Sequence, residues 1–228
     1  MLENRTTRGR PRGTTKRDLE LIAMRLFTEQ GFDETTVEQI AAAAGISGRT
    51  FFRYFPTKAE VLWWQFDDEV AALRAAFATV PDDVPLMTAV RRVVVSANQY
   101  RAEDVPELRT RMQLVATVPA LSATAGAHYD AWERAVSAFA AGRMGEPADA
   151  LIPHAVGRTT LAAARAAVDA GLARGDPPDA LIPLAVGRTT LAAARAAFDA
   201  WLARADADLT VYLDEALAAL ERGFATVP

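Results

Sequence analysis

The sequence predicts an all-α protein. Apolar residues recur at helical spacings of three and four along most of its 228 residues. No segment shows the strict alternation of apolar and polar residues that is typical of a half-buried strand. Glycines, prolines and acidic residues divide the chain at intervals that suit helix ends. These three observations favour a helical subunit, and the length allows it one compact core or two modest domains.

Composition narrows the class of protein further. Hydrophobic residues make up 51% of the chain, the formal net charge is −4, and there is no cysteine. Disulfides and thiolate chemistry are therefore excluded, which suits a reducing compartment. No apolar run reaches the length of a membrane span, and the N-terminus lacks the apolar core of a signal peptide. We expect a cytoplasmic protein that needs no membrane and no cofactor.

The first predicted helix covers about residues 15–30. Its apolar stripe faces one side, and Gly31 provides a stop signal. The stripe consists of Leu19, Ile22, Ala23, Leu26 and Phe27.

Two short helices with a tight turn between them follow. Val37, Ile40, Ala41 and Ala44 form one apolar face, and Gly45 then accepts the left-handed backbone that a sharp turn needs. The second of these helices covers about 48–55. Ser47 is its expected N-cap, Phe51 and Phe55 are expected to point inward, and Gly48, Arg49, Thr50 and Arg53 remain on the outer side. This is a helix-turn-helix whose second helix suits a major groove.

The spacing of hydroxyl and carboxylate residues predicts two capping boxes. They pair Thr35 with Glu38 and Thr57 with Glu60. A long helix over about 58–78 would then begin at Lys58, whose charge adds to the positive end of the helix dipole and makes a phosphate clamp.

The N-terminal arm is basic. Residues 1–17 carry six Lys or Arg against one Glu, a surplus of five positive charges in a chain that is negative overall. The run around Arg8, Arg10 and Arg12 resembles the core of an AT-hook, which places arginines in a narrow A·T-rich minor groove. A solubilising tail is the alternative interpretation.

The run TTVEQIAAAAGISGRTFFRYFPTK, residues 35–58, resembles the DNA-binding signature of the TetR family of bacterial repressors. The resemblance implies a DNA-binding domain over 1–57 and a ligand-binding and dimerisation domain over 58–228. Phe52 stands where the family usually has tyrosine, and Arg49 where glycine is common, so the operator sequence is not transferable. In this family the residues at or near DNA correspond to Thr36, Ser47, Gly48, Arg49, Thr50, Phe52, Arg53, Tyr54 and Lys58. A helix pair used only for packing is the alternative.

Three further helices are predicted over 85–102, 105–116 and 119–144, and the resemblance implies that they enclose an effector together with the helix at 58–78. Apolar stripes of this kind usually fill a core, but polar groups among them would orient a mainly hydrophobic ligand. The RTFFRYF run and the Ala/Arg-rich C-terminal helices resemble an actinobacterial subgroup of the family that includes the regulator of the mycofactocin system, which implies a long-chain acyl-CoA or another lipid-like effector. The candidate ligand-binding residues are Trp63, Trp64, Asn98, Gln99, Met112, Gln113, His128 and Trp132.

A tandem duplication occupies residues 147–206. The blocks 147–176 and 177–206 agree at 25 of 30 positions. On a helix, the differing positions give the second copy the larger apolar stripe, with Leu184, Leu191, Phe198 and Trp201, where the first copy has His154, Leu161, Val168 and Gly171. We therefore expect the second copy and the final helix to form a homodimer interface, with the first copy as an extra helix at one side. The reverse assignment of the copies is the alternative.

These features favour a dimeric, ligand-responsive repressor that binds a double-stranded DNA operator with an inverted repeat and is released by a small-molecule effector. An effector-independent DNA-binding or architectural protein is the second hypothesis. An enzyme is the third, but the chain has no nucleophile elbow, phosphate loop or paired-carboxylate motif. The two histidines lie far apart, so no metal site is expected.

Overall fold

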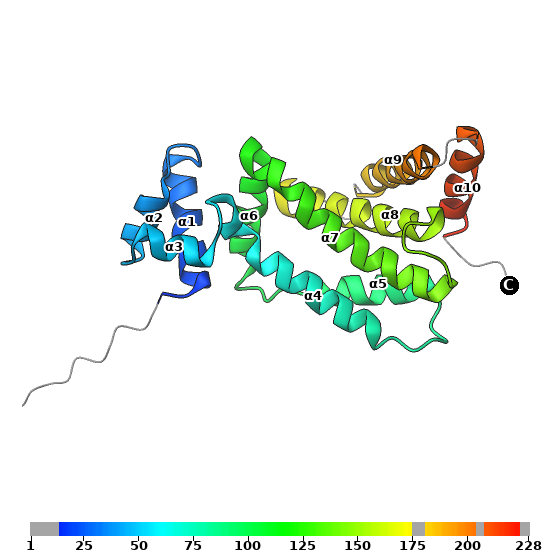
Figure 1. Ribbon diagram of the computed structural model, residues 1–228, viewed down its shortest axis with the longest axis horizontal. Helices are drawn as coiled ribbons and strands as arrows, with labels where there is room; N and C mark the ends of the chain where they lie inside the picture. The colour runs from blue at the N-terminus through cyan, green and yellow to red at the C-terminus, as the bar shows by residue number, and fades with distance from the viewer. Residues whose placement is uncertain (1–13, 175–180, 204–207, 224–228) are drawn as a thin grey trace, which may run out of the picture. The chain divides into compact units, whose positions relative to one another are not determined.

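The computed structural model describes residues 14–174, 181–203 and 208–223, and all regular structure in these ranges is helical (Figure 1). The predicted all-α class is thus confirmed. The chain divides into two compact units, Met1–Leu62 and Trp63–Pro228. Within the described ranges, no helix has the length and apolarity needed to cross a membrane.

From residue 14 onward, the first unit is built from three α-helices and one 3₁₀ turn. Thr15 caps the first helix through a reciprocal pair of hydrogen bonds with Asp18, and Gly31, at φ 91°, ends it. Leu19, Ile40 and Phe51, one from each helix, are fully buried, and α2 contacts both α1 and α3. The elements are α1 (Lys16–Gln30), α2 (Val37–Ala43), α3 (Gly48–Tyr54) and η1 (Ala59–Leu62).

The turn between α2 and α3 has the geometry that the sequence predicts. Gly45 adopts φ 68°, and its amide donates to the Ala42 carbonyl at 3.1 Å. The Ile46 amide donates to the Ala41 carbonyl at 2.9 Å, which completes a Schellman motif. A side chain at position 45 would strain this backbone, because L-residues rarely adopt positive φ.

Two predicted helix starts are wrong. The cap of α2 is Thr36 with Gln39, rather than Thr35 with Glu38. Thr35 is buried instead, and its hydroxyl donates to the Gly31 carbonyl at 2.7 Å. When two hydroxyl residues are adjacent, the one that finds a buried acceptor is not available as the cap.

The helix expected to begin at Lys58 begins at Trp64, after the separate turn η1. Half of the second predicted capping box remains, because the Glu60 amide donates to the Thr57 hydroxyl at 3.3 Å. Lys58 therefore does not lie in the first turn of an α-helix, and the dipole argument for a phosphate clamp does not apply to it.

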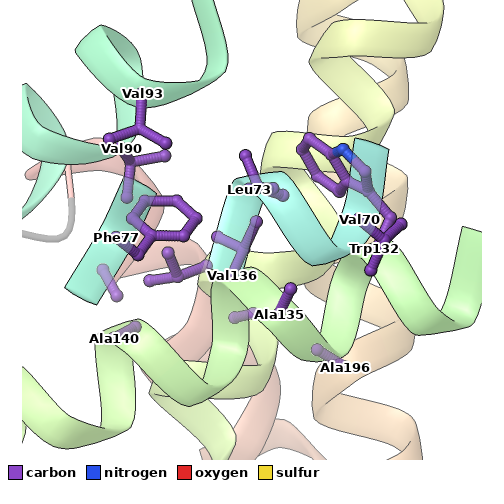
Figure 2. Packing of buried hydrophobic residues seen from close by; sticks show 13 residues of the cluster. Val70, Leu73, Phe77, Val90, Val93, Trp132, Ala135, Val136, Ala140 and Ala196 are labelled. Carbon is purple, nitrogen blue, oxygen red and sulfur yellow. The ribbon is translucent and has the colours of Figure 1, made fainter. Parts of the chain in front are cut away.

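The described residues of the second unit form seven α-helices and one π-helical turn. A core cluster joins α4, α5 and α7, where Leu73 and Phe77 point toward Val136 (Figure 2). The stacked rings of Phe77 and Phe139, 4.4 Å apart, extend the contact between α4 and α7. The elements are α4 (Trp64–Ala78), α5 (Leu86–Ala97), α6 (Val105–Thr117), α7 (Pro119–Met144), α8 (Leu151–Val168), η2 (Asp169–Arg174), α9 (Leu181–Leu202) and α10 (Leu209–Glu221).

The first copy of the repeat forms α8 and η2, and the second copy forms α9. α8 packs against α7 on one side and against α9 on the other, and α10 packs mainly on α9 (Figure 1). The expectation that the first copy is an extra helix at one side is therefore wrong. The small residues of α8 are what allow this central position, since Ala155 and Val156 are fully buried and Gly157 lies against α7.

Candidate nucleic-acid interface

The outer face of α3 carries the residues that can reach DNA. Arg49, Phe52 and Arg53 are exposed, with Phe52 52% exposed, whereas Phe51 and Phe55 are fully or almost fully buried. The two buried rings pack 5.6 Å apart and hold α3 on the core of the first unit. The inward and outward sides of this helix are those that its sequence predicts.

The start of α3 is fixed by local hydrogen bonds. The Ser47 hydroxyl accepts from the Thr50 amide at 3.2 Å and lies 3.0 Å from the Thr50 hydroxyl. Gly48 has an ordinary φ, and a Cβ added there would only come within 3.7 Å of the Glu38 carboxylate. Packing within the subunit therefore does not require glycine at position 48. Thr36, the N-cap of α2, is exposed.

Tyr54 links α3 to the segment that precedes α1. Its hydroxyl donates to the Thr14 carbonyl at 2.9 Å, and the Thr14 hydroxyl donates to the Ala44 carbonyl at 3.0 Å. The chain thus enters α1 from a point held against both helices of the helix-turn-helix. Arg8, Arg10 and Arg12 lie outside the described residues.

Lys58 contacts the subunit's own backbone. Its Nζ donates to the Phe32 carbonyl at 2.5 Å and to the Thr35 carbonyl at 2.7 Å, and it lies 4.1 Å from the centroid of the Phe32 ring. Burial lowers the pKa of the ammonium, and the charges of Asp33 and Glu34 oppose this shift. These contacts connect the start of η1 to the loop between α1 and α2, a role that its charge pattern did not predict.

The structure brings together only part of the predicted ligand-binding set. Trp63 and His128 stack with their ring centroids 4.6 Å apart. Trp132 is buried in the cluster of Figure 2. Trp64 and Met112 are half-buried, and Gln113 is exposed on α6.

Asn98 and Gln99 lie beyond the end of α5, and both are exposed. The helix predicted over 85–102 stops at Ala97, and the side-chain amide of Asn98 donates back to the Val94 carbonyl at 2.8 Å. This local bond caps the helix end, which explains why α5 is shorter than its apolar pattern indicates.

We call the packed rings of Trp63, Phe66, His128 and Tyr129 the Trp63 cluster. The Trp63 indole donates to the Thr124 hydroxyl at 3.0 Å, and His128 Nδ1 lies 2.8 Å from the Asp67 carboxylate. The Arg165 guanidinium lies over the Tyr129 ring, 4.5 Å from its centroid. The pKa of Tyr129 is raised by burial, and Arg165 opposes this shift. Phe66 and Tyr129 pack against each other in this cluster, and helical spacing places Phe66 beside Trp63 and Tyr129 beside Trp132.

An open depression of about 680 Å³ lies elsewhere, at the start of α8, the end of α9 and along α10. Its lining includes Leu151, Ile152 and Val211 together with acidic residues. It therefore does not coincide with the region among α4 to α7 that the sequence indicates for an effector.

The four residues predicted for dimerisation occupy different environments on α9. Leu191 and Phe198 are 62% and 45% exposed, whereas Leu184 and Trp201 are half-buried. Trp201 packs toward the cluster formed with Tyr212 of α10. Leu202, 62% exposed, extends the exposed stripe and was not among the residues predicted for dimerisation.

Comparison with known proteins supports the regulator class. The model for bacterial regulatory proteins of the TetR family matches residues 22–62. The model described as the MftR C-terminal domain matches twice, over 84–176 and 173–225, so that each match contains one copy of the repeat.

Two curated relatives carry the same assignment. A protein of Mycobacterium tuberculosis described as the mycofactocin biosynthesis transcriptional regulator MftR is 30% identical over 161 residues, which cover 71% of this chain and 81% of that protein. The transcriptional regulator TcmR of Streptomyces glaucescens is 56% identical over 39 residues, 17% of each chain.

Two solved structures align along most of the chain at low similarity. Thermus thermophilus FadR, a TetR-family repressor solved with lauroyl-CoA, has 20% identity and a TM-score of 0.47, with 94% of this chain and 97% of that chain covered. Mycobacterium smegmatis AmtR has 19% identity and a TM-score of 0.43, with 96% and 99% covered.

The family assignment rests on the two family models and on the relative from M. tuberculosis, and it agrees with the helix-turn-helix geometry of the first unit. The chain belongs to the TetR family of bacterial transcriptional regulators.

Proposed function

We propose that this protein is a dimeric repressor that binds an inverted-repeat operator through α3 and is released by a hydrophobic or amphipathic effector. The observation that carries the DNA-binding half is the outer face of α3. Arg49 and Arg53 are exposed there on a helix that the Schellman turn and the Ser47 cap hold rigidly. Arginine can pair bidentately with guanine or hold a phosphate, so this face can supply both base recognition and affinity.

Fluorescence anisotropy at several salt concentrations tests this interface, on an operator found by genome-wide binding and footprinting. Arg53→Ala or Arg49→Ala should weaken binding, and each lost phosphate contact should reduce the salt slope by about 0.9. A change in sequence preference with Arg49→Ala would assign Arg49 to base recognition. Arg25→Ala is the matched control, because Arg25 is exposed on α1 and pairs with Glu29. Unchanged affinity and slope in both α3 variants would reject α3 as the contact surface.

The connection between Tyr54 and Thr14 suggests how the basic arm contributes. Tyr54→Phe removes the hydroxyl that holds Thr14 while keeping the ring. If the arm contacts an A·T-rich minor groove, this variant and deletion of residues 1–13 should both lose most affinity on operators with A·T-rich flanks. Equal losses on G·C-rich flanks would leave the arm with only a general electrostatic role.

We place the dimer interface on the exposed stripe of α9. Leu191, Phe198 and Leu202 lie on one side of the helix and are 62%, 45% and 62% exposed. Large apolar side chains in such a continuous row favour a protein interface. A second copy of the chain is the occupant that fits a regulator with one reading helix per subunit, because an inverted repeat requires two-fold symmetry.

Light scattering tests this placement with Leu191→Asp combined with Phe198→Asp, which should give monomers. Trp201 is left intact, because it packs toward α10 and its loss would also disturb the fold. Val95→Asp is the control, since Val95 is 55% exposed but lies on α5. If the protein with both α9 substitutions is still a dimer, the interface lies on another surface.

The effector half of the proposal rests on the Trp63 cluster and on the likeness to MftR. Trp63, at the boundary of the second unit, is almost fully buried among rings that a lipophilic ligand could separate. Such a ligand releases DNA only if it binds the DNA-incompetent state more tightly, since equal affinity for both states shifts nothing. Long-chain acyl-CoA is the first candidate.

Anisotropy of the operator complex, titrated with palmitoyl-CoA and with free CoA as control, tests the effector. Native mass spectrometry of the purified protein would detect a co-purifying lipid. An effector-independent DNA-binding protein is the second candidate function, favoured by the exposure of Asn98, Gln99 and Gln113 and by the internal partners of Trp63 and His128. Operator affinity that no acyl-CoA or lipophile alters would favour that candidate.

A further inference from the structure

The two copies of the repeat contact each other through reciprocal ion pairs. Arg158 of the first copy lies with Nη2 2.7 Å from Asp199 Oδ2 of the second. Arg188 of the second copy lies with Nη1 2.5 Å from Asp169 Oδ2 of the first. Arg158 and Arg188 occupy the same repeat position, and so do Asp169 and Asp199. Exchanging the two copies therefore turns each ion pair into the other.

Helix geometry explains why one sequence can form both pairs. The arginine and the aspartate are eleven residues apart in each copy, and eleven residues at 3.6 per turn return to nearly the same side of a helix. When two such helices pack antiparallel, each arginine meets the other helix's aspartate. Only residues 175–180 separate η2 from α9, and so short a connection favours this orientation.

Alanines lie on both helices between the two ion pairs. Ala166 of α8 and Ala193 and Ala196 of α9 are fully buried. Small side chains let the helix axes come close over a flat, complementary strip. The contact therefore has an ion pair at each end and buried alanines between them, and the two ion pairs use the same repeat positions from both copies. This is an isologous interface, the kind that joins two identical subunits.

From this symmetry we propose that the α8–α9 contact is a homotypic interface that a second copy of the chain can supply. α9 of each chain then packs against α8 of the other chain, so that the α8–α9 contact forms twice between the two chains. The proposal concerns the α8 face of α9, whereas the dimer stripe with Leu191 and Phe198 lies on another side of that helix. It therefore goes beyond the proposed function and does not depend on DNA binding.

The test uses the Asp169–Arg188 pair in the full chain, because Arg158 also contacts Glu133 and His154. D169R places two arginines opposite each other within one chain, and R188D places two aspartates there. When the two single variants are combined, the arginine introduced by D169R in one chain can pair with the aspartate introduced by R188D in the other. In the other α8–α9 contact of the same dimer, Asp169 of the R188D chain pairs with Arg188 of the D169R chain. Exchange between chains is therefore the only arrangement in which every pair is satisfied.

The two variants, given tags of different mass, are co-refolded and examined by native mass spectrometry. The ratio of mixed to unmixed dimers should exceed its random value by about tenfold. Wild type co-refolded with D169R/R188D is the matched control, since both chains are satisfied internally and should stay at the random ratio. D169R/R188D should also regain the thermal stability that each single variant loses.

Two results would overturn the proposal. Single variants that mix only at the random ratio, while D169R/R188D recovers its stability, would restrict the contact to one chain. A double variant that fails to recover would show that Asp169 and Arg188 do not form the pair. Operator binding by D169R/R188D, measured separately, distinguishes either result from a failure of the repressor proposal.

Discussion

α8 and α9 contain the same stretch of sequence, AVGRTTLAAARAA, in two different environments. Val156 is fully buried, whereas Val186, its equivalent, is 58% exposed. Leu161 is half-buried, whereas Leu191 is 62% exposed. Local propensity is identical in the two helices, so the difference comes entirely from the neighbours that each helix receives. Burial in this protein is decided by tertiary packing, while the sequence decides only which side of a helix is apolar.

The neighbour that makes the difference is α7. A Cβ built on Gly157 would lie 2.1 Å from the Ser137 hydroxyl and 2.7 Å from the Glu133 carbonyl, whereas a Cβ on Gly187 meets nothing within 4 Å. α7 thus approaches α8 at backbone distance, and the equivalent surface of α9 remains open in the subunit. Making the same substitution at equivalent positions of the two copies tests this difference in their surroundings.

The largest effect is expected for alanine at the two glycines. Gly157→Ala should destabilise the protein by about 1–3 kcal/mol, because the backbone of α7 must move to admit the methyl group. Gly187→Ala should instead stabilise α9 by about 0.5–1 kcal/mol, since alanine costs less conformational entropy in a helix. Urea unfolding of the two variants checks both signs. Equal effects would mean that the two copies have equivalent surroundings in solution.

A smaller contrast is expected at the valines. Val156→Ala removes buried methyl groups and should lower the free energy of unfolding by about 2 kcal/mol. Val186→Ala should stay within about 0.5 kcal/mol of wild type, because its side chain is mostly exposed. Denaturant midpoints measured below the dimer dissociation concentration test this. A large loss at Val186 would instead indicate that another surface covers it.

The smallest effect concerns His154, which the second copy replaces with Leu184. Burial and the adjacent Arg158 lower the pKa of His154, and the carboxylate of Asp199 opposes this shift. Glu133 also faces the ring, 3.5 Å from Nδ1. Because the unfolded chain takes up the proton at about 6.5 and the folded chain only at lower pH, stability should fall as pH drops through 6.5.

His154→Leu should flatten this dependence of unfolding free energy on pH. Measurements belong above the range in which carboxylates titrate, because burial raises the pKa of Glu133 and its protonation would add an opposite trend. Wild type measured over the same buffers is the reference. An equally steep decline in the variant would assign the pH dependence to other groups.

Strong local signals made most of the fold predictable. Gly45 adopts the left-handed turn and Ser47 the N-cap that the sequence predicts, and α7 spans the residues expected from Pro119 to Met144. The errors lie where two local solutions compete. Thr35 and Thr36 are both good caps, and the burial of Thr35 with its bond to the Gly31 carbonyl decides between them. Such contacts depend on folded neighbours that the sequence does not reveal.

The candidate sites divide in the same way. The outward side of α3 follows from helical period alone, so Arg49 and Arg53 could be placed in advance. The ligand-binding residues depended on which helices meet, which the sequence does not reveal. Asn98 caps the end of α5 instead of lying within the helix. The smaller stripe of the first copy suggested a helix at one side of the subunit, which is wrong, because a helix that packs at backbone distance needs glycine and alanine instead of large residues.

The reciprocal Arg–Asp contact also sets this repeat apart from the repeats of a solenoid. An isologous contact closes on itself, so two copies satisfy each other and leave no matching charged strip for another. The repeat therefore closes at two units within this chain, whereas an open-ended solenoid can grow one unit at a time.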